Sequence, residues 1–136
     1  AGMKEIQTRK IEKHKHAAYM HKAASFCRGM ENAAAEENWN GASLNAIHCA
    51  ISSSDAVTTY LLGERPAGQR HEDAAALLEK TGLLEAKEKA RQFLDIIQLK
   101  TLIEYEPDEP TEAQARQIIK QTQRFHQWAK QILQKQ

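Results

Sequence analysis

The sequence predicts an all-α fold: an up-and-down antiparallel bundle of four long helices plus one short helix, forming a single domain over residues 3–136. Apolar residues recur at the 3.6-residue period of a helix over long stretches, and no stretch shows a run of the apolar–polar alternation of a half-buried strand. Clusters of glycine, proline and asparagine separate these stretches. At 136 residues, 41% of them hydrophobic, the chain is long enough to bury one core.

The first helix is predicted over residues 4–37, and the turn cluster NWNG at residues 38–41 follows it. Its pattern is less regular before Tyr19, so its first turns could project or fray. Its apolar side consists of Ile6, Ile11, Tyr19, Met20, Phe26 and Met30.

The second helix, predicted over residues 40–63, is the central element. Asn40 can cap its first turn, and Gly63 can end it because glycine accepts a left-handed conformation. One face carries only small side chains and no face is strongly charged, which is typical of a helix buried on most sides. The small residues are Ala46, Cys49, Ala50, Ser53 and Ala56.

The remaining elements follow from turn signals. Residues 63–70, GERPAGQR, are predicted as a surface loop, residues 71–81 as a short helix that Gly82 ends, and residues 84–103 as a fourth helix. Residues 104–110, EYEPDEP, cannot continue that helix because they hold two prolines.

The last helix begins at a capping box formed by Thr111 and Gln114, in which a hydroxyl and an amide lie three residues apart. Its predicted inner residues are Ile118, Ile119, Thr122, Phe125, Ala129, Ile132 and Leu133.

Charge and composition favour a cytoplasmic protein with no membrane span. The formal net charge is +1, but residues 4–28 hold seven basic and two acidic residues, whereas residues 104–112 hold five acids and no base. These segments could pair with each other or with partners. No apolar run approaches ~20 residues, and no signal peptide is expected before the fold. Ala1 and Gly2, before Met3, are interpreted as the remnant of a removed tag.

No metal and no cofactor are expected. Cys27 and Cys49 have neither zinc-site nor redox spacing, and we interpret them as reduced packing thiols. His14, His16 and His21 lack a carboxylate or cysteine at ligand spacing. The lysines among them would repel a cation, although they could instead face a phosphate.

A buried polar group is predicted on the central helix. Asp55 falls in its apolar stripe, and a buried carboxylate needs a partner. His48 shares the stripe but lies about 10 Å away along the axis, so the two cannot bond directly. Either His71 or Lys100 bridges them, or a neighbouring helix satisfies Asp55 in a structural role. Glu104 and Tyr105 belong to the same set of buried polar candidates.

An anion site is predicted where the loop 63–70 meets the next helix. Arg65 and Arg70 offer bidentate donors, and the free amides at the helix start near His71 favour an anion. Lys100 is the fourth candidate ligand. The alternative is a solvated turn in which His71 caps the helix.

Residues 45–80, from NAIHCAISSSD to HEDAAALLEK, resemble the core of HEPN domains (higher eukaryotes and prokaryotes nucleotide-binding), which are small helical bundles. In these domains a small-residue helix with a mid-helix polar group precedes a loop and a helix that starts with His and an acid. The resemblance covers about residues 15 to 133. The matching residues are His71-Glu72, Leu77-Leu78, Glu104-Tyr105 and Phe125.

The resemblance implies a bundle that often dimerises, binds nucleotides or RNA, and works beside a nucleotidyltransferase or in a toxin–antitoxin pair. Ribonuclease members carry Arg, four to six residues, then His, at the fourth-helix position. Here that position offers Lys100 and Glu104-Tyr105 without a histidine, while Arg65 and His71 have the spacing in an earlier loop.

We therefore expect a non-catalytic HEPN-like module that binds a nucleotide, RNA or a protein partner. One alternative is an enzyme, a HEPN-type ribonuclease that uses Arg65 and His71, and the other is a structural scaffold without a ligand site. A homodimer is expected because the small face of the central helix and the side of the last helix with Trp128 offer more packing surface than one bundle must bury.

Overall fold

A computed structural model describes residues 6–68 and 70–134, so the proposed tag remnant and residues 4 and 5 of the first predicted helix lie outside the described residues. The described chain is mostly helical, as predicted, with one short two-stranded sheet. No helix in these ranges is long and apolar enough to cross a membrane. The elements are β1 (Thr8–Lys10), the 3-10 turn η1 (Lys13–Lys15), α1 (His16–Ala35), α2 (Trp39–Leu62), β2 (Glu64–Pro66), α3 (His71–Glu79), α4 (Ala86–Tyr105) and α5 (Glu112–Gln134).

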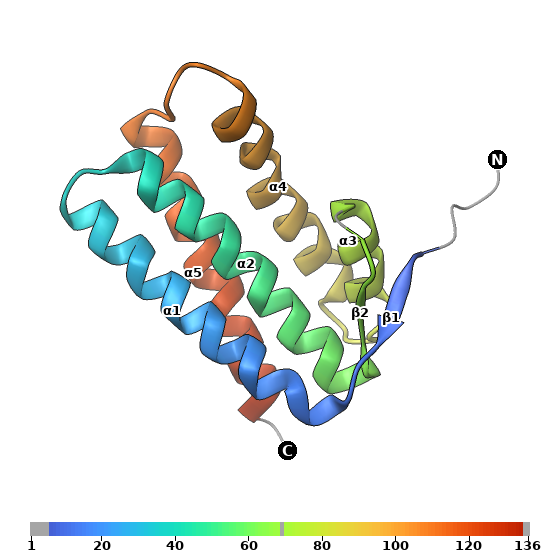
Figure 1. Ribbon diagram of the computed structural model, residues 1–136. Coiled ribbons are helices and arrows are strands. Elements are labelled where there is room, and N and C mark those ends of the chain that lie inside the picture. The colour runs from blue at the N-terminus through green and yellow to red at the C-terminus, as the bar shows by residue number, and fades with distance from the viewer. Residues whose placement is uncertain (1–5, 69, 135–136) are drawn as a thin grey trace, which may run out of the picture.

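Helix α2 is the central element, as the small-residue pattern predicts. It contacts each of the helices α1, α3, α4 and α5, and most of its residues between Ala42 and Thr59 are buried. Figure 1 shows α1, α2 and α5 side by side, with α4 and the short α3 on the other flank of α2. The small face lies inside this arrangement, where it allows close approach of the neighbouring helices.

The reason given for a homodimer is therefore wrong. Ala46, Ala50, Ser53 and Ala56 are 0% exposed within one chain, and Trp128 is 7% exposed. The indole Nε1 of Trp128 donates to Glu85 Oε1 at 2.8 Å, so this side chain is satisfied inside the fold. These residues offer no spare packing surface, and the homodimer remains a prediction from the resemblance alone.

The helix ends follow local hydrogen bonding. Asn38, not Asn40, caps α2: its Oδ1 accepts from the Gly41 amide at 3.0 Å, and Asn40 already lies in the first turn. The predicted capping box is confirmed, since Thr111 N donates to Gln114 Oε1 at 2.9 Å and Gln114 N donates to Thr111 Oγ1 at 3.1 Å.

The prediction of one helix over residues 4–37 is wrong at its start. Residues 8–10 form β1, which pairs antiparallel with β2 in the register Thr8↔Pro66, Arg9↔Arg65 and Lys10↔Glu64. The predicted loop 63–70 likewise contains a strand. A strand of three residues is too short to show alternation, and its pairing partner lies far away in the sequence.

The later boundaries shift by about two residues. Helix α4 begins at Ala86 and runs through Tyr105, past its predicted end at residue 103, while α3 ends at Glu79. Pro107 explains where α4 stops, because the residue before a proline avoids the helical conformation. Glu106 accordingly has extended dihedral angles.

The end of α2 gives a first test of the fold. Gly63 has φ +66°, and an added Cβ would lie 3.3 Å from the carbonyl oxygen of Ile11. We expect Gly63→Ala to lower the free energy of unfolding by about 1–2 kcal/mol, measured by urea unfolding. Gly68→Ala is the matched control, since a Cβ there meets no atom within 4 Å. Equal unfolding midpoints for the two variants would contradict this expectation.

Candidate anion-binding site

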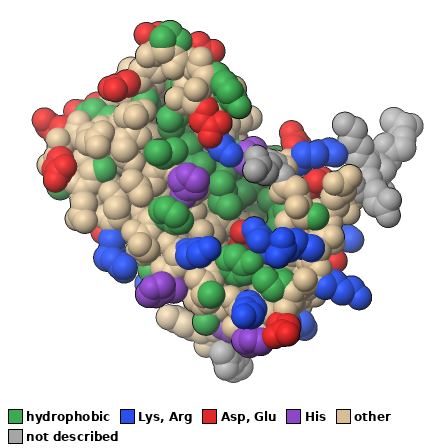
Figure 2. Space-filling model, viewed as in Figure 1, with side chains coloured by type: hydrophobic (Ala, Val, Ile, Leu, Met, Phe, Trp, Pro, Cys, Tyr) green, Lys and Arg blue, Asp and Glu red, His purple; other side chains and the backbone are tan. Residues whose placement is uncertain are grey.

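Six of the eight predicted site residues line one hollow of about 250 Å³, here called the α2–α4 hollow. Its apolar lining includes Ile51, Ala74 and Phe93. Figure 2 shows this face of the molecule, where basic and histidine side chains surround a hollow with a largely hydrophobic floor. The six polar residues are His48, Asp55, Arg65, Arg70, His71 and Lys100.

The ribbon of β1 and β2 places Arg65 at this hollow. The Ile11 amide donates to the Gly63 carbonyl and the Ala67 amide to the Gln7 carbonyl, both at 2.9 Å. Thr8 Oγ1 also donates to Glu64 Oε1 at 2.9 Å. Sequence reasoning missed this role of the N-terminal segment, because nothing in residues 7–11 alone indicates a partner.

Asp55 is buried, as predicted, but its partner is Arg65 rather than a group that bridges to His48. Arg65 Nη2 lies 3.4 Å from Asp55 Oδ2, in a hydrogen-bonded ion pair. Burial raises the pKa of Asp55 to about 6, because desolvation outweighs the opposing charges of Arg65 and Lys22. Within the described residues no hydrogen bond links Asp55 to His48 through His71 or Lys100, and the partner lies in β2 rather than in a neighbouring helix. The His48 ring instead stacks on Phe26, with centroids 5.1 Å apart.

Arg65 retains donor capacity in this arrangement. A guanidinium has five N–H groups, and the bond to Asp55 is its one hydrogen bond within the described part of the chain. Its Nε is buried without a hydrogen-bond partner. Its guanidinium lies 5.2 Å from the centroid of the Tyr19 ring, which holds it in place. The arrangement leaves N–H groups that an anion in the hollow could satisfy.

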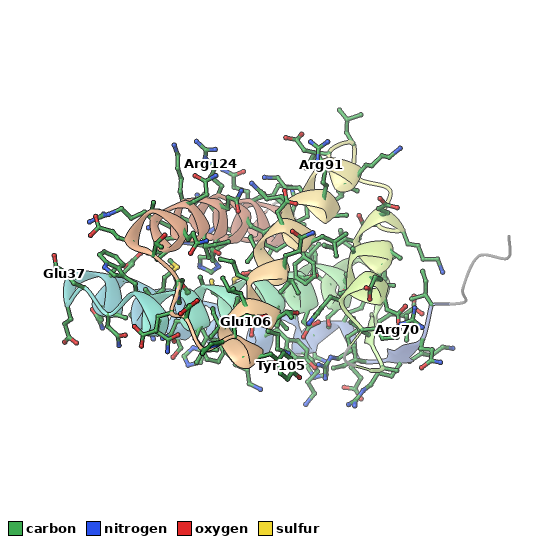
Figure 3. The ribbon with its side chains drawn as sticks, turned by 90° about the horizontal axis from the view of Figure 1, so that it is seen from above. Glu37, Arg70, Arg91, Tyr105, Glu106 and Arg124 are labelled. Carbon is green, nitrogen blue, oxygen red and sulfur yellow. The ribbon has the colours of Figure 1, made fainter. Side chains whose placement is uncertain are left out.

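Arg70 and His71 begin α3. Arg70 is the N-cap residue, so His71 does not cap this helix, and no side chain caps it. Figure 3 shows Arg70 at this end of α3, close to the β1–β2 ribbon. Its Nε lies 3.9 Å from Asp73 Oδ2, a long contact that leaves most of its donors unused.

The pKa of His71 lies below its ordinary value of 6.5. Burial and the positive charge of Lys100 lower the pKa of His71, against the smaller opposing effects of Glu72 and Glu104. His71 is therefore neutral at pH 7. At that pH, the positive charge at the hollow comes from Arg65, Arg70 and Lys100.

Glu104 and Tyr105 do not line the hollow. Tyr105 is 77% exposed, so its predicted burial is wrong, and Figure 3 shows it at the end of α4. The carboxylate of Glu104 lies 3.9 Å from Lys100 Nζ and its side chain is 40% exposed. Residues 104 and 105, in the last turn of α4, are exposed, which the sequence pattern does not indicate.

Within residues 6–68 and 70–134, no group of three His, Cys, Asp or Glu side chains could hold a metal ion. Cys27 and Cys49 are free thiols, and burial raises the pKa of Cys49 to about 12. Cys49 is thus a protonated thiol at neutral pH.

Comparison with protein-family models, with curated proteins and with solved structures finds no match to this chain. Three cations, one buried carboxylate and an apolar floor suit an anion that also carries an apolar part, since ligand sites combine apolar walls with a few placed polar groups.

Proposed function

We propose that this chain is a non-catalytic module that binds a nucleotide in the α2–α4 hollow, with its phosphate on Arg65, Arg70 and Lys100. The observation that supports this most directly is the convergence of these cations from three elements on a hollow with an apolar floor. Charge-assisted bonds from arginine are the usual means of holding phosphate, and Phe93 gives a base an apolar surface. In this proposal the helices form the up-and-down HEPN-like bundle that the sequence resembles.

A ribonuclease is the second candidate. Arg65 and His71 line the same hollow, and neutral His71 has the protonation state of a general base. We favour binding alone because the fourth-helix histidine of ribonuclease members is absent. Cleavage of a short RNA by wild type, lost in His71→Ala, would reverse this choice.

Partners remain predictions of the resemblance. They are a second copy of this chain, RNA, and a nucleotidyltransferase or toxin–antitoxin partner protein. The proposed nucleotide site itself is built from residues of one chain.

The binding proposal predicts a loss of affinity when the arginines are removed. Calorimetric titration with adenosine 5′-monophosphate (AMP) is expected to show weak binding to wild type and at least about tenfold weaker binding to Arg65→Ala/Arg70→Ala, because charge-assisted hydrogen bonds are lost. The same comparison at higher salt is expected to weaken binding to wild type.

Arg91→Ala/Arg124→Ala is the matched control for charge. Both arginines are exposed, and Figure 3 shows them on the opposite side of the molecule from Arg70. The control changes net charge by the same amount and is expected to keep wild-type affinity. No binding to wild type, or equal losses in both double variants, would contradict the proposal and favour the structural scaffold.

A further inference from the structure

A second hollow lies on the other side of Arg65. It has a volume of about 390 Å³ and is formed by residues of α1, α2 and β2, so it is called the α1–α2 hollow here. Its own residues are Tyr19, Lys22, Ser25, Phe26 and Ser52, and it shares Ile51, Asp55 and Arg65 with the α2–α4 hollow. Because three residues line both, the two hollows adjoin along this common wall.

Two aromatic rings, those of Tyr19 and Phe26, line the α1–α2 hollow. The guanidinium of Arg65 lies over the Tyr19 ring. Phe26 lines this hollow and His48 lines the other, and their rings stack with an interplanar angle of 28°. Flat aromatic surfaces of this kind accept a nucleobase of any sequence, because every base has a π-face.

Positive charge runs through both hollows. Lys22 lies at the α1–α2 hollow, Arg65 at the common wall, and Arg70 and Lys100 at the α2–α4 hollow. Asp55 is the one carboxylate among the described residues that line either hollow. Cations alternating with aromatic rings along a groove are suited to a phosphate-linked chain of nucleosides.

We propose that the two hollows form one site whose ligand is a pair of nucleosides joined through phosphate. This inference rests on the proposed nucleotide function. One nucleoside occupies the α2–α4 hollow, the linking phosphate lies at Arg65, and the second base stacks in the α1–α2 hollow. A mononucleotide occupies only the first. A strand of linked nucleotides and a soluble dinucleotide share this chemistry.

Four ligands test the inference in titrations of the full chain. They are AMP, adenosine 5′-diphosphate (ADP), the 5′-phosphorylated dinucleotide pApA, and two adenosines joined through diphosphate. ADP controls for the additional charge of pApA. At least one of the two-nucleoside ligands is expected to bind about tenfold more tightly than ADP, because a second base is stacked. Tighter binding of pApA identifies a strand, and tighter binding of the diphosphate-linked ligand a soluble dinucleotide.

Variants of the α1–α2 hollow locate the second base. Phe26→Leu and Lys22→Ala are expected to abolish the tenfold advantage, while AMP affinity changes by less than about twofold. Lys87→Ala, at an exposed lysine of α4 that lines neither hollow, is the charge control. Thermal unfolding checks that Phe26→Leu remains folded. Lys22→Ala tests the location of the second base independently, because it changes an exposed side chain.

The failures are distinguishable. AMP binding with no advantage for either two-nucleoside ligand over ADP would overturn this inference and leave the nucleotide function in place. An advantage that survives both Phe26→Leu and Lys22→Ala would also overturn it. Absence of binding by AMP and ADP would overturn the nucleotide function, and this inference with it.

Discussion

Replacing Asp55 by asparagine is expected to raise the free energy of unfolding at pH 7.5 by up to about 3 kcal/mol. The carboxylate is 6% exposed and has one ion pair, at 3.4 Å. Burial raises its pKa from the ordinary 3.8 to about 6, so ionisation is less favourable in the folded chain than in the unfolded chain. At 1.36 kcal/mol per pKa unit, this difference corresponds to about 3 kcal/mol. Asparagine keeps the shape and an acceptor for Arg65 without a buried charge.

The pH dependence fixes the sign of this effect. Because the folded pKa of Asp55 lies above its unfolded value, the folded state binds more protons between about pH 4 and pH 6. The contribution of Asp55 to stability is full below about pH 4 and is lost as the pH rises through about 6. The increase in the free energy of unfolding caused by Asp55→Asn should therefore be present at pH 7.5 and disappear near pH 4.

Urea unfolding at several pH values measures this difference. Asp95→Asn, at an exposed carboxylate of α4, is the control and should change stability by less than about 0.5 kcal/mol. If Asp55→Asn were less stable than wild type at pH 7.5, the ionised pair with Arg65 would have to stabilise the fold.

The same substitution is expected to strengthen anion binding, since Arg65 would no longer face a negative charge. In wild type, protonation of Asp55 below about pH 6 has the same effect. Protonation of His71 also adds positive charge to the hollow. It occurs at a pH below the ordinary pKa of histidine, because burial and Lys100 lower the pKa of His71. Once the second ionisation of the AMP phosphate at about pH 6 is allowed for, affinity for AMP should thus rise as the pH falls, and less so in Asp55→Asn.

Phe125→Ala is expected to lower the free energy of unfolding by about 3–5 kcal/mol, because it leaves a cavity in the centre of the core. Phe125 is 0% exposed, with ring centroids of Phe93 at 5.7 Å and Trp128 at 5.5 Å. Phe93 also forms part of the α2–α4 hollow, so the site would lose its support on the core side.

Two controls separate the cavity from the loss of an aromatic ring. Phe125→Leu keeps most of the volume and should be less destabilising than Phe125→Ala. Tyr105→Ala removes an exposed ring at the end of α4 and should change stability by less than about 0.5 kcal/mol. Thermal or urea unfolding measures all three, and a loss below about 1 kcal/mol for Phe125→Ala would contradict this description of the core.

The helices could be predicted from the sequence because their signals are local. The period of apolar residues, Gly63 at the end of α2 and the capping box at Thr111 each act within a few residues. Asn38 and Asn40 both have cap chemistry, and only the path of the backbone decides between them. Local signals were thus sufficient for the kind of element and insufficient for the exact boundary.

The partner of Asp55 could not be predicted, because it depends on pairing between distant segments. Arg65 reaches Asp55 from β2, whose position is set by hydrogen bonds to residues some 56 positions earlier. The position of Tyr19 and Lys22 in the α1–α2 hollow, beside Asp55 and Arg65, could not be predicted for the same reason. They share a face of α1 with Phe26 at spacings of three and four residues, a signal that is visible only once α1 is known to lie against α2.

The ribbon of β1 and β2 has a consequence for any measured affinity. Its two strands have three residues each and none of these residues is fully buried, so we expect it to open without unfolding of the helical core. While it is open, Arg65 is displaced, and the apparent dissociation constant is the intrinsic value divided by the fraction of molecules with a closed ribbon. The amides of Ile11 and Ala67 bond across this ribbon, so their hydrogen exchange reports that fraction. Ligand affinity and the protection of these two amides from hydrogen exchange are therefore linked. A substitution in β1 would change ligand affinity by shifting the equilibrium between the closed and the open ribbon, although the substituted residue does not contact the ligand.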